Sequence, residues 1–228
     1  MPDLDFQITG ANAAEHALTP LIQFTLQVTN RTLRENIEGV SLNVQIQLQC
    51  PQRTYSKTEK ERLSELFGTP ERWGETLRNR LWTQLSTTVR PFTDSVESKL
   101  PVPCTYDLNV STAKYFHALD SGDVGLLFLF SGTVFYRDMN RQLQVSQIPW
   151  NKECTYRMPV ELWREVMAQH YPNSTWVNLH RDVFERLYEY RRLHGLATWD
   201  DAVDRLLETA ARDDVTQAIN SDGEGVLV

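Results

Sequence analysis

Two long stretches of the chain alternate between apolar and polar residues. In PLIQFTLQVTN (residues 20–30) and in VSLNVQIQLQC (residues 40–50), every second residue is apolar. A period of two with one polar face predicts antiparallel strands that cover a hydrophobic core. We expect these two strands to pair with each other, and DFQIT (residues 5–9) to join them as a third strand.

The pattern becomes helical over residues 54–80. Ser56 and Glu59 have the spacing of a capping box at a helix start, and Gly68 is a typical residue at a helix end. A second helix is expected to open at Thr69-Pro70. The sequence therefore predicts a charged helical insertion, which further strands over residues 82–89 and 95–102 follow.

The most apolar passage of the chain is VGLLFLFSGTVFYRD, residues 124–138. A membrane-spanning helix needs about 20 predominantly apolar residues, so this passage is too short to span a bilayer and no membrane insertion is expected. A short helix is expected before it, over residues 107–122, and an extended segment after it, over 142–150. We interpret 124–138 as a buried strand in which Gly132 is a bulge or a point of close approach.

Helical patterns dominate from residue 159 onward, with helices expected over 181–195 and 198–214. The predicted fold class is α+β: an antiparallel β-sheet core with a helical insertion, followed by a C-terminal helical subdomain. In this scheme residues 1–158 form the β-rich domain and residues 159–214 the helical subdomain. Residues 215–228 are expected to be a frayed tail.

Charge and cysteine content narrow the class of protein. The 228 residues carry a formal net charge of −7, which argues against a uniformly basic surface for nucleic acid. Three widely separated cysteines without a CxxC pair indicate neither a zinc knuckle nor a disulfide framework. The first residues carry acids and lack the apolar core of a signal peptide. A cytoplasmic location is expected.

Candidate catalytic residues are few. Ser131 lies in LFSGT, which lacks the GxSxG spacing of a nucleophile elbow. Cys104 is the best candidate for a reactive thiol, because His117 follows thirteen residues later and could pair with it. An enzyme of unknown class that uses Cys104, Asp107 and His117 therefore stays an alternative.

Motifs for cofactors and metals are also lacking. The sequence has no GxGxxG motif, no P-loop and no HxxxH or HExxH set. We expect no cofactor and no metal site, and a protein that is not an enzyme.

Residues 175–207, TWVNLHRDVFERLYEYRRLHGLATWDDAVDRLL, resemble a ribbon-helix-helix module. The resemblance implies a strand, two helices, dimerisation through the strand and DNA contacts from its outward side chains. That strand contains no lysine or arginine before Arg181, and residues 159–228 hold thirteen acids against seven arginines. Nucleic acid is an unfavoured partner for this reason, and DNA-binding regulation stays an alternative function.

Five separated motifs resemble those of a bacterial family whose domain has no assigned function: YSKTEKERLSELFG, RWGETLRNRLW, LPVPCTYDLNVSTAKYFHAL, LLFLFSGTVFY and LATWDDAVDRLL. The resemblance covers about residues 4–208. Genes of that family occur in clusters for high-affinity uptake [NiFe]-hydrogenases, which implies an accessory role in hydrogenase assembly or support. It implies no catalytic residues.

A weaker similarity links residues 5–136 to the export chaperone SecB. The shared order is a set of strands followed by a helix and a further strand; SGDVGLL stands where SecB has a Gly-Phe-Pro-Pro-Leu entry. Together these features predict a non-enzymatic accessory or chaperone-like protein that binds another polypeptide. Hydrogenase subunits or maturation factors are the partners that the family context suggests, and homo-oligomerisation is left open.

Overall fold

The computed structural model describes residues 2–32, 35–104, 110–174, 177 and 179–223. It divides into two compact units, residues 1–175 and residues 176–228. The first unit holds the described strands and the helices as far as α4 (Val160–His170), and the second holds two further helices. Helix α4 packs against the sheet strands, so this division falls later in the chain than the boundary expected after residue 158.

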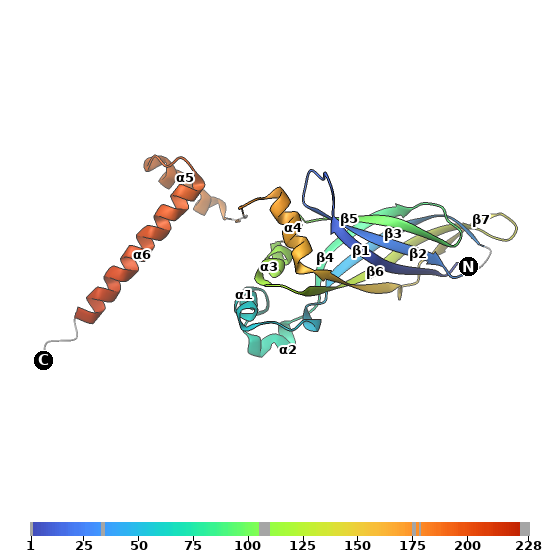
Figure 1. The fold of residues 1–228 in the computed structure, drawn as a ribbon, viewed down its shortest axis with the longest axis horizontal. Helices are drawn as coiled ribbons and strands as arrows, with labels where there is room; N and C mark the ends of the chain where they lie inside the picture. The colour runs from blue at the N-terminus through green and yellow to red at the C-terminus, as the bar shows by residue number, and fades with distance from the viewer. Residues whose placement is uncertain (1, 33–34, 105–109, 175–176, 178, 224–228) are drawn as a thin grey trace. The chain divides into compact units, whose positions relative to one another are not determined.

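The strands of the first unit form two antiparallel sheets, as Figure 1 shows. One sheet has the order β1 (Leu4–Ala13), β2 (Leu21–Asn30), β5 (Ser95–Pro103). The other has the order β4 (Arg80–Val89), β3 (Asn36–Leu48), β6 (Asp123–Arg137), and both β7 (Leu143–Gln147) and β8 (Glu153–Pro159) pair with β6. With its helices, this architecture confirms the predicted α+β class.

The two alternating stretches form strands β2 and β3, but their expected pairing with each other is wrong. Strand β2 pairs with β1 and β5, whereas β3 pairs with β4 and β6 in the other sheet. An alternating pattern shows which face of a strand is buried, but it does not show which strand lies next to it. Strands of two facing sheets have the same alternating pattern, because each sheet buries one face against the other. Residues 5–9, expected as a third strand, lie in β1 and pair with β2.

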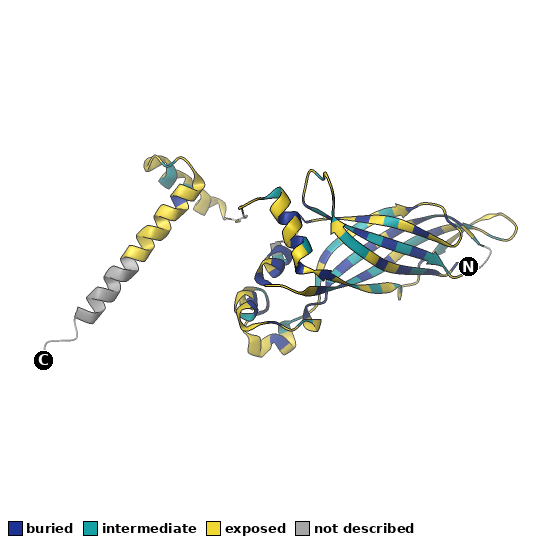
Figure 2. Cartoon of the chain, in the orientation of Figure 1, coloured by how far each residue is buried: buried dark blue, intermediate teal, exposed yellow. Residues whose placement is uncertain are grey.

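The hydrophobic core lies between the two sheets, where the buried faces meet (Figure 2). Phe6 of β1 stacks on Phe130 of β6 with ring centroids 4.6 Å apart. Phe24 of β2 makes an edge contact with Phe128 of β6 at 5.3 Å. Each such side chain contributes about 1.5–3 kcal/mol when it is fully buried, so these cross-sheet contacts join the sheets.

The helices of the first unit gather at one end of the paired sheets (Figure 1). They are α1 (Lys57–Phe67), the short α2 (Trp73–Thr76), α3 (Val110–Ala118) and α4, with the 3-10 turns η1 (Cys50–Gln52) and η2 (Pro70–Arg72). The predicted capping box is present: the Glu59 amide donates to Ser56 Oγ at 3.1 Å, and the Ser56 amide donates to Glu59 Oε2 at 2.8 Å. Gly68 ends α1 with a φ of 74°.

Strand β6 confirms the interpretation of residues 124–138. Its inward side chains are buried, and Gly132 has a φ of 139°, a conformation that other residues rarely adopt. Strand β8 was not predicted, although Cys154, Tyr156 and Met158 alternate with polar residues there. It extends the sheet along the first half of β6, and β7 extends it along the second half.

The second unit consists of α5 (Arg181–Leu193) and α6 (Trp199–Gly223). Both helices were predicted, and α6 continues to Gly223, through part of the segment that was expected to be a frayed tail from residue 215. No glycine or proline occurs between Trp199 and Asp222, so nothing in the sequence stops the helix earlier. Residues 224–228 lie outside the described residues.

Candidate functional site

Two places in the chain have the properties of a binding site, and the first is the surface of α5 and α6. Among the described side chains of this unit, Ala202 is the one that is buried. Figure 2 shows both helices exposed along most of their described length. Large apolar side chains at helical spacing are among the exposed ones, and we call them the α5–α6 face: Phe184, Tyr188, Trp199, Val203, Leu206 and Leu207.

The start of α6 positions Trp199 within this face. The Thr198 amide donates to Asp201 Oδ2 and the Asp201 amide donates to Thr198 Oγ1, each at 3.0 Å. These two bonds form a capping box that fixes the first turn. Hydrogen bonds from the side chain and the amide of Thr198 lower the pKa of Asp201. The indole of Trp199 then lies 5.3 Å from the ring of Phe184, measured between centroids.

Arg191 completes the contact between the two helices. Its guanidinium carbon lies 4.1 Å from the centroid of Trp199, a cation–π contact. The contact uses one face of Trp199 and leaves Val203, Leu206 and Leu207 beyond it exposed. The helices therefore meet at one aromatic cluster and leave an apolar stripe open.

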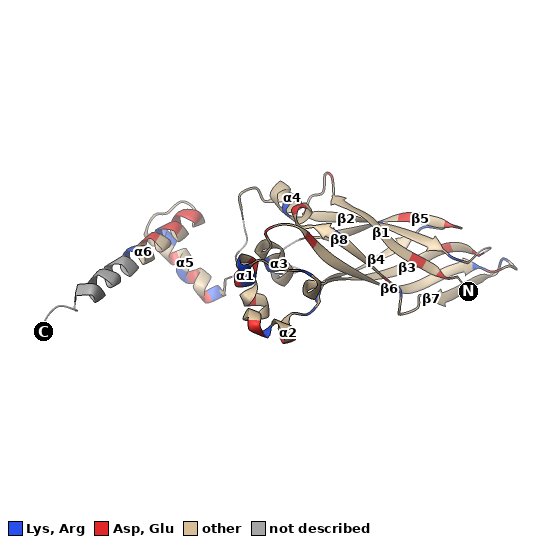
Figure 3. Ribbon diagram, turned by 60° about the horizontal axis from the view of Figure 1, so that its bottom comes forward, with Lys and Arg blue, Asp and Glu red and all other residues tan. Residues whose placement is uncertain are grey.

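Acidic residues border the α5–α6 face at the start of α6. Residues 176–228 contain eleven acidic residues and six arginines. Four of these acidic residues follow Arg212 and lie outside the described side chains, so seven acidic residues and six arginines remain along the described helices. Figure 3 shows acidic positions on both helices. Asp200 and Asp201 lie in the first turn of α6, and Asp204 follows in the next turn. On α5 the glutamates are paired with arginines, as in the Arg181–Glu185 ion pair of 3.0 Å. An apolar surface with an acidic border is the result.

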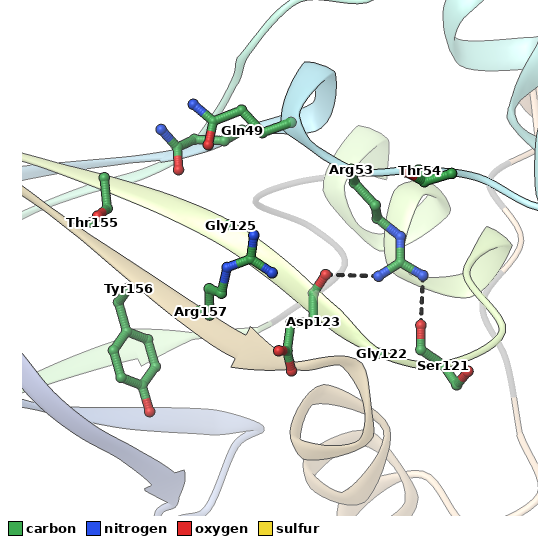
Figure 4. Close-up of a pocket in the computed structure, with 11 residues that line it drawn as sticks. Gln49, Arg53, Thr54, Ser121, Gly122, Asp123, Gly125, Thr155, Tyr156 and Arg157 are labelled. Carbon is green, nitrogen blue, oxygen red and sulfur yellow. Dashed lines mark hydrogen bonds between the residues drawn. The ribbon is translucent and has the colours of Figure 1, made fainter.

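The second place is a pocket of about 430 Å³ in the first unit, shown in Figure 4. It lies over the outward face of the sheet, where η1 and the turn before β6 cover the start of β6 and the end of β8. The residues that line it are mostly polar: Gln49, Gln52, Arg53, Thr54, Ser121, Gly122, Asp123, Gly125, Thr155, Tyr156 and Arg157.

Arg53 forms one wall of this pocket and joins three segments. Its Nη1 donates to the Asp123 carbonyl at 2.7 Å and its Nη2 donates to the Ser121 carbonyl at 2.5 Å, the two bonds drawn in Figure 4. Nη2 also donates to Glu59 Oε1 at 2.9 Å. The side chains of this ion pair are 12% and 4% exposed. Arg53 thus has a structural role, and its buried Nε has no acceptor among the described residues.

Arg157 and Asp123 are the other charged residues that line the pocket. Arg157 of β8 lies directly opposite Gly125 of β6, and Asp123 is two residues before Gly125, so the two charged side chains are diagonal neighbours. Within the described residues, neither charged group makes a hydrogen bond or an ion pair. Sequence reasoning did not bring Asp123 and Arg157 together, because their proximity depends on the β6–β8 pairing.

A family comparison matches residues 1–215 to a family of unknown function, DUF6084. The chain belongs to this family. The match covers nearly the whole sequence, and it confirms the expectation of a family without an assigned function.

Other comparisons add no functional information to DUF6084 membership. Comparison with the curated proteins gives no match. Among solved structures, beta-glucosidase 3B from Thermotoga neapolitana in complex with alpha-D-glucose is similar at 12% identity and a TM-score of 0.24. That match covers 69% of this chain and 17% of the glucosidase chain. A likeness at this level supports no functional argument.

DUF6084 membership assigns no catalytic residues, so Cys104 and His117 must be judged by their surroundings. Cys104 is 7% exposed, and burial raises the pKa of its thiol to about 12. Its Sγ lies 3.6 Å from the Val102 carbonyl. The protonated, enclosed thiol is a poor nucleophile.

His117 is exposed on α3 with its ring edge-on to Trp163, at a centroid distance of 4.9 Å. Partial burial and the charge of Arg164 lower its pKa. Asp107 lies outside the described residues. The surroundings of Cys104 therefore argue against a nucleophilic thiol, and the alternative of an enzyme that uses Cys104, Asp107 and His117 stays a prediction.

The ribbon-helix-helix interpretation depends on a strand before α5. In the described part of that segment, Val177, Leu179 and His180 are not in a strand. Thr175, Trp176 and Asn178 lie outside the described residues. The two helices that the module requires are present as α5 and α6.

The described residues also lack the features of a metal site and of a membrane-spanning helix. No group of three or more His, Cys, Asp and Glu side chains there is arranged to hold a metal ion. Within the same ranges, no helix is both long and apolar enough to cross a membrane.

Proposed function

We propose that this protein is a non-enzymatic, cytoplasmic accessory protein that binds another polypeptide through the α5–α6 face. The observation that carries the proposal is the second unit itself, whose two helices expose a stripe of large apolar side chains and bury one alanine among the described side chains. The role is chaperone-like in that it covers an apolar segment of a partner.

Burial of the α5–α6 face against a partner would lower the free energy of the second unit. A helix gains most of its stability from packing an apolar face, and two helices that share one aromatic cluster have little core of their own. Leu207 is 63% exposed, and full burial of a leucine contributes about 1.5–3 kcal/mol. Contiguous apolar patches of this kind are typical of protein interaction sites. A partner that covers the stripe would supply the missing core.

The charged residues beside the apolar stripe indicate which charge a partner segment should carry. Asp200 and Asp204 flank the stripe at the start of α6, so a second copy would bring two acidic helix starts together. An amphipathic helix with lysines or arginines beside its apolar side would instead match these two carboxylates, whereas Glu208 is already paired with Arg212 at 3.7 Å. We therefore propose a basic, amphipathic helical segment of a different protein as the occupant.

The resemblance to a family encoded with uptake [NiFe]-hydrogenases supports one class of partner. Hydrogenase subunits and maturation factors are the first proteins to test, and an accessory role in hydrogenase assembly or support is the proposed setting. Deletion of the gene should lower hydrogenase activity or assembly in the native host. Unchanged activity and assembly after deletion would remove the hydrogenase part of the proposal.

The docking surface can be tested with matched variants of the full chain. Leu207→Ser should weaken capture of the partner from native cells at least about tenfold, because it removes one exposed apolar contact and a polar group must then be buried. Leu143→Ser in β7 is the control, since Leu143 is also exposed but lies in the first unit. Capture that falls equally for both variants, or for neither, would contradict a partner site on the α5–α6 face.

A further inference from the structure

The pocket over the start of β6 contains two opposite charges that do not satisfy each other. Asp123 and Arg157 come from neighbouring strands and are diagonal neighbours across the β6–β8 pair. Among the described residues, each charged group lacks a hydrogen bond and an ion pair. Both line the same pocket, together with neutral groups such as the side-chain amide of Gln49 (Figure 4).

The third charged residue of the pocket, Arg53, adds no free charge, because its guanidinium is paired with the Glu59 carboxylate. Both of its Nη atoms donate to backbone carbonyls, and Nη2 is also paired with Glu59. The charges that remain for a ligand are one guanidinium and one carboxylate. The Asp123 carboxylate would repel a phosphate, and the Arg157 guanidinium would repel a metal cation. A molecule with one positive and one negative group and no net charge could pair with both residues.

We propose that this pocket binds a small zwitterion of the α-amino acid class. The Arg157 guanidinium holds the ligand carboxylate, which it can contact through two parallel hydrogen bonds. The Asp123 carboxylate holds the ligand ammonium group. The volume of about 430 Å³ lies in the range of small-molecule sites, and the neutral polar groups of Gln49 and Thr155 can receive the rest of the ligand.

Gly125 lets the side chain of Gln49 pack closely against β6 in the floor of the pocket. It lies directly opposite Arg157 in the strand pair, and the side chain of Gln49 lies on its other side. A β-carbon at position 125 would lie 3.0 Å from Gln49 Oε1 and 3.3 Å from Gln49 Cβ. Any side chain at this position therefore crowds Gln49 and forces it to move within the pocket.

Titration calorimetry of the full chain tests this assignment. The probes are the individual L-α-amino acids, with acetate and methylammonium as molecules that carry one half of the zwitterion and inorganic phosphate as a divalent anion. We expect at least one amino acid to bind with a stoichiometry of one, and both half-ligands to bind at least about a hundredfold more weakly, because each lacks one ion pair.

Variants locate the binding in this pocket. Arg157→Gln and Asp123→Asn should each weaken amino-acid binding at least about tenfold, and Gly125→Ala should weaken it by crowding the floor. Arg72→Gln is the control, because Arg72 is exposed on η2 and does not line the pocket. Melting temperatures of all variants show whether the fold is kept.

Three results would overturn the assignment. One is the absence of binding for every amino acid at millimolar concentration. Another is acetate or phosphate binding as tightly as the amino acids, which would show an anion site. The third is amino-acid binding that Arg157→Gln and Asp123→Asn leave unchanged, which would place the ligand elsewhere. The pocket lies in the first unit, so these results are independent of partner binding to α5 and α6.

Discussion

Gly132 of β6 lies so close to Ser41 of β3 that a β-carbon at position 132 would stand 2.0 Å from the Ser41 carbonyl oxygen. The φ of 139° at Gly132 is itself a conformation that residues with a side chain rarely adopt. The backbone of the longest strand therefore needs glycine at this point for two independent reasons. Gly132 also lies beside the end of β7, which finishes at Gln147. The amide of the next residue, Ile148, donates to the Gly132 carbonyl at 2.9 Å.

Replacement of Gly132 should destabilise the first unit. Gly132→Val is expected to lower the free energy of unfolding by about 3 kcal/mol or more, because it adds backbone strain and a collision with Ser41. Chemical denaturation measures the change. Ser131→Ala is the control, since Ser131 is exposed on the same strand and should lose less than about 0.5 kcal/mol. Equal stabilities of the two variants would show that Gly132 is merely permissive.

The carboxylate of Glu59 should make stability depend on pH. Burial opposes its ionisation, but the amides of Asp120 and Ser56 and the Arg53 guanidinium outweigh burial and lower its pKa below the usual 4.5. A lowered pKa in the folded state contributes stability that is complete above the unfolded pKa. That contribution is lost as the pH falls through the folded value.

Glu59→Gln tests this contribution directly. At pH 7 it should cost roughly 3 kcal/mol, because Arg53 stays buried without its carboxylate. The difference from wild type should shrink as the pH is lowered below about 4.5, where Glu59 takes up a proton. Glu61→Gln, an exposed position in the same helix, should leave the pH dependence unchanged. A constant difference between wild type and Glu59→Gln from pH 7 to pH 3 would contradict the account.

The Cys104 thiol should be inert in the folded protein. Its pKa of about 12 leaves almost no thiolate at pH 8, and the side chain is buried. Alkylation by iodoacetamide, mapped by mass spectrometry, should be at least about a hundredfold slower in native protein than in urea. Native labelling as fast as in urea would reopen the alternative of a catalytic cysteine.

Local signals in the sequence were sufficient for most elements of the fold. The capping box at Ser56 and Glu59 fixes the start of α1 within a few residues, and the alternating stretches identify β2 and β3. Gly132 could be recognised because a glycine inside a strong strand pattern typically marks a bulge or a close backbone approach. The pairing of strands could not be predicted, since neighbours in a sheet are chosen by contacts between distant segments.

The two candidate sites could not be predicted from the sequence, and the physical reason is the same for both. The apolar stripe of α6 has the spacing of any packed helix, and its exposure becomes visible only when the structure shows that no core covers Leu206 and Leu207. Asp123 and Arg157 are brought together by β8, a strand whose alternation over residues 153–159 is short. Burial and pairing, which decide both sites, are properties of the folded chain.

The most direct test of the proposed function is site-specific photo-crosslinking in native cells. The photoreactive residue p-benzoyl-phenylalanine would replace Leu207 on the α5–α6 face in one strain and Trp150, which is 93% exposed in the first unit, in another. Position 207 should crosslink to a different polypeptide through a basic, amphipathic segment, and position 150 should not. Crosslinks from position 207 to a second copy of this chain alone, or to no protein, would contradict the proposed function.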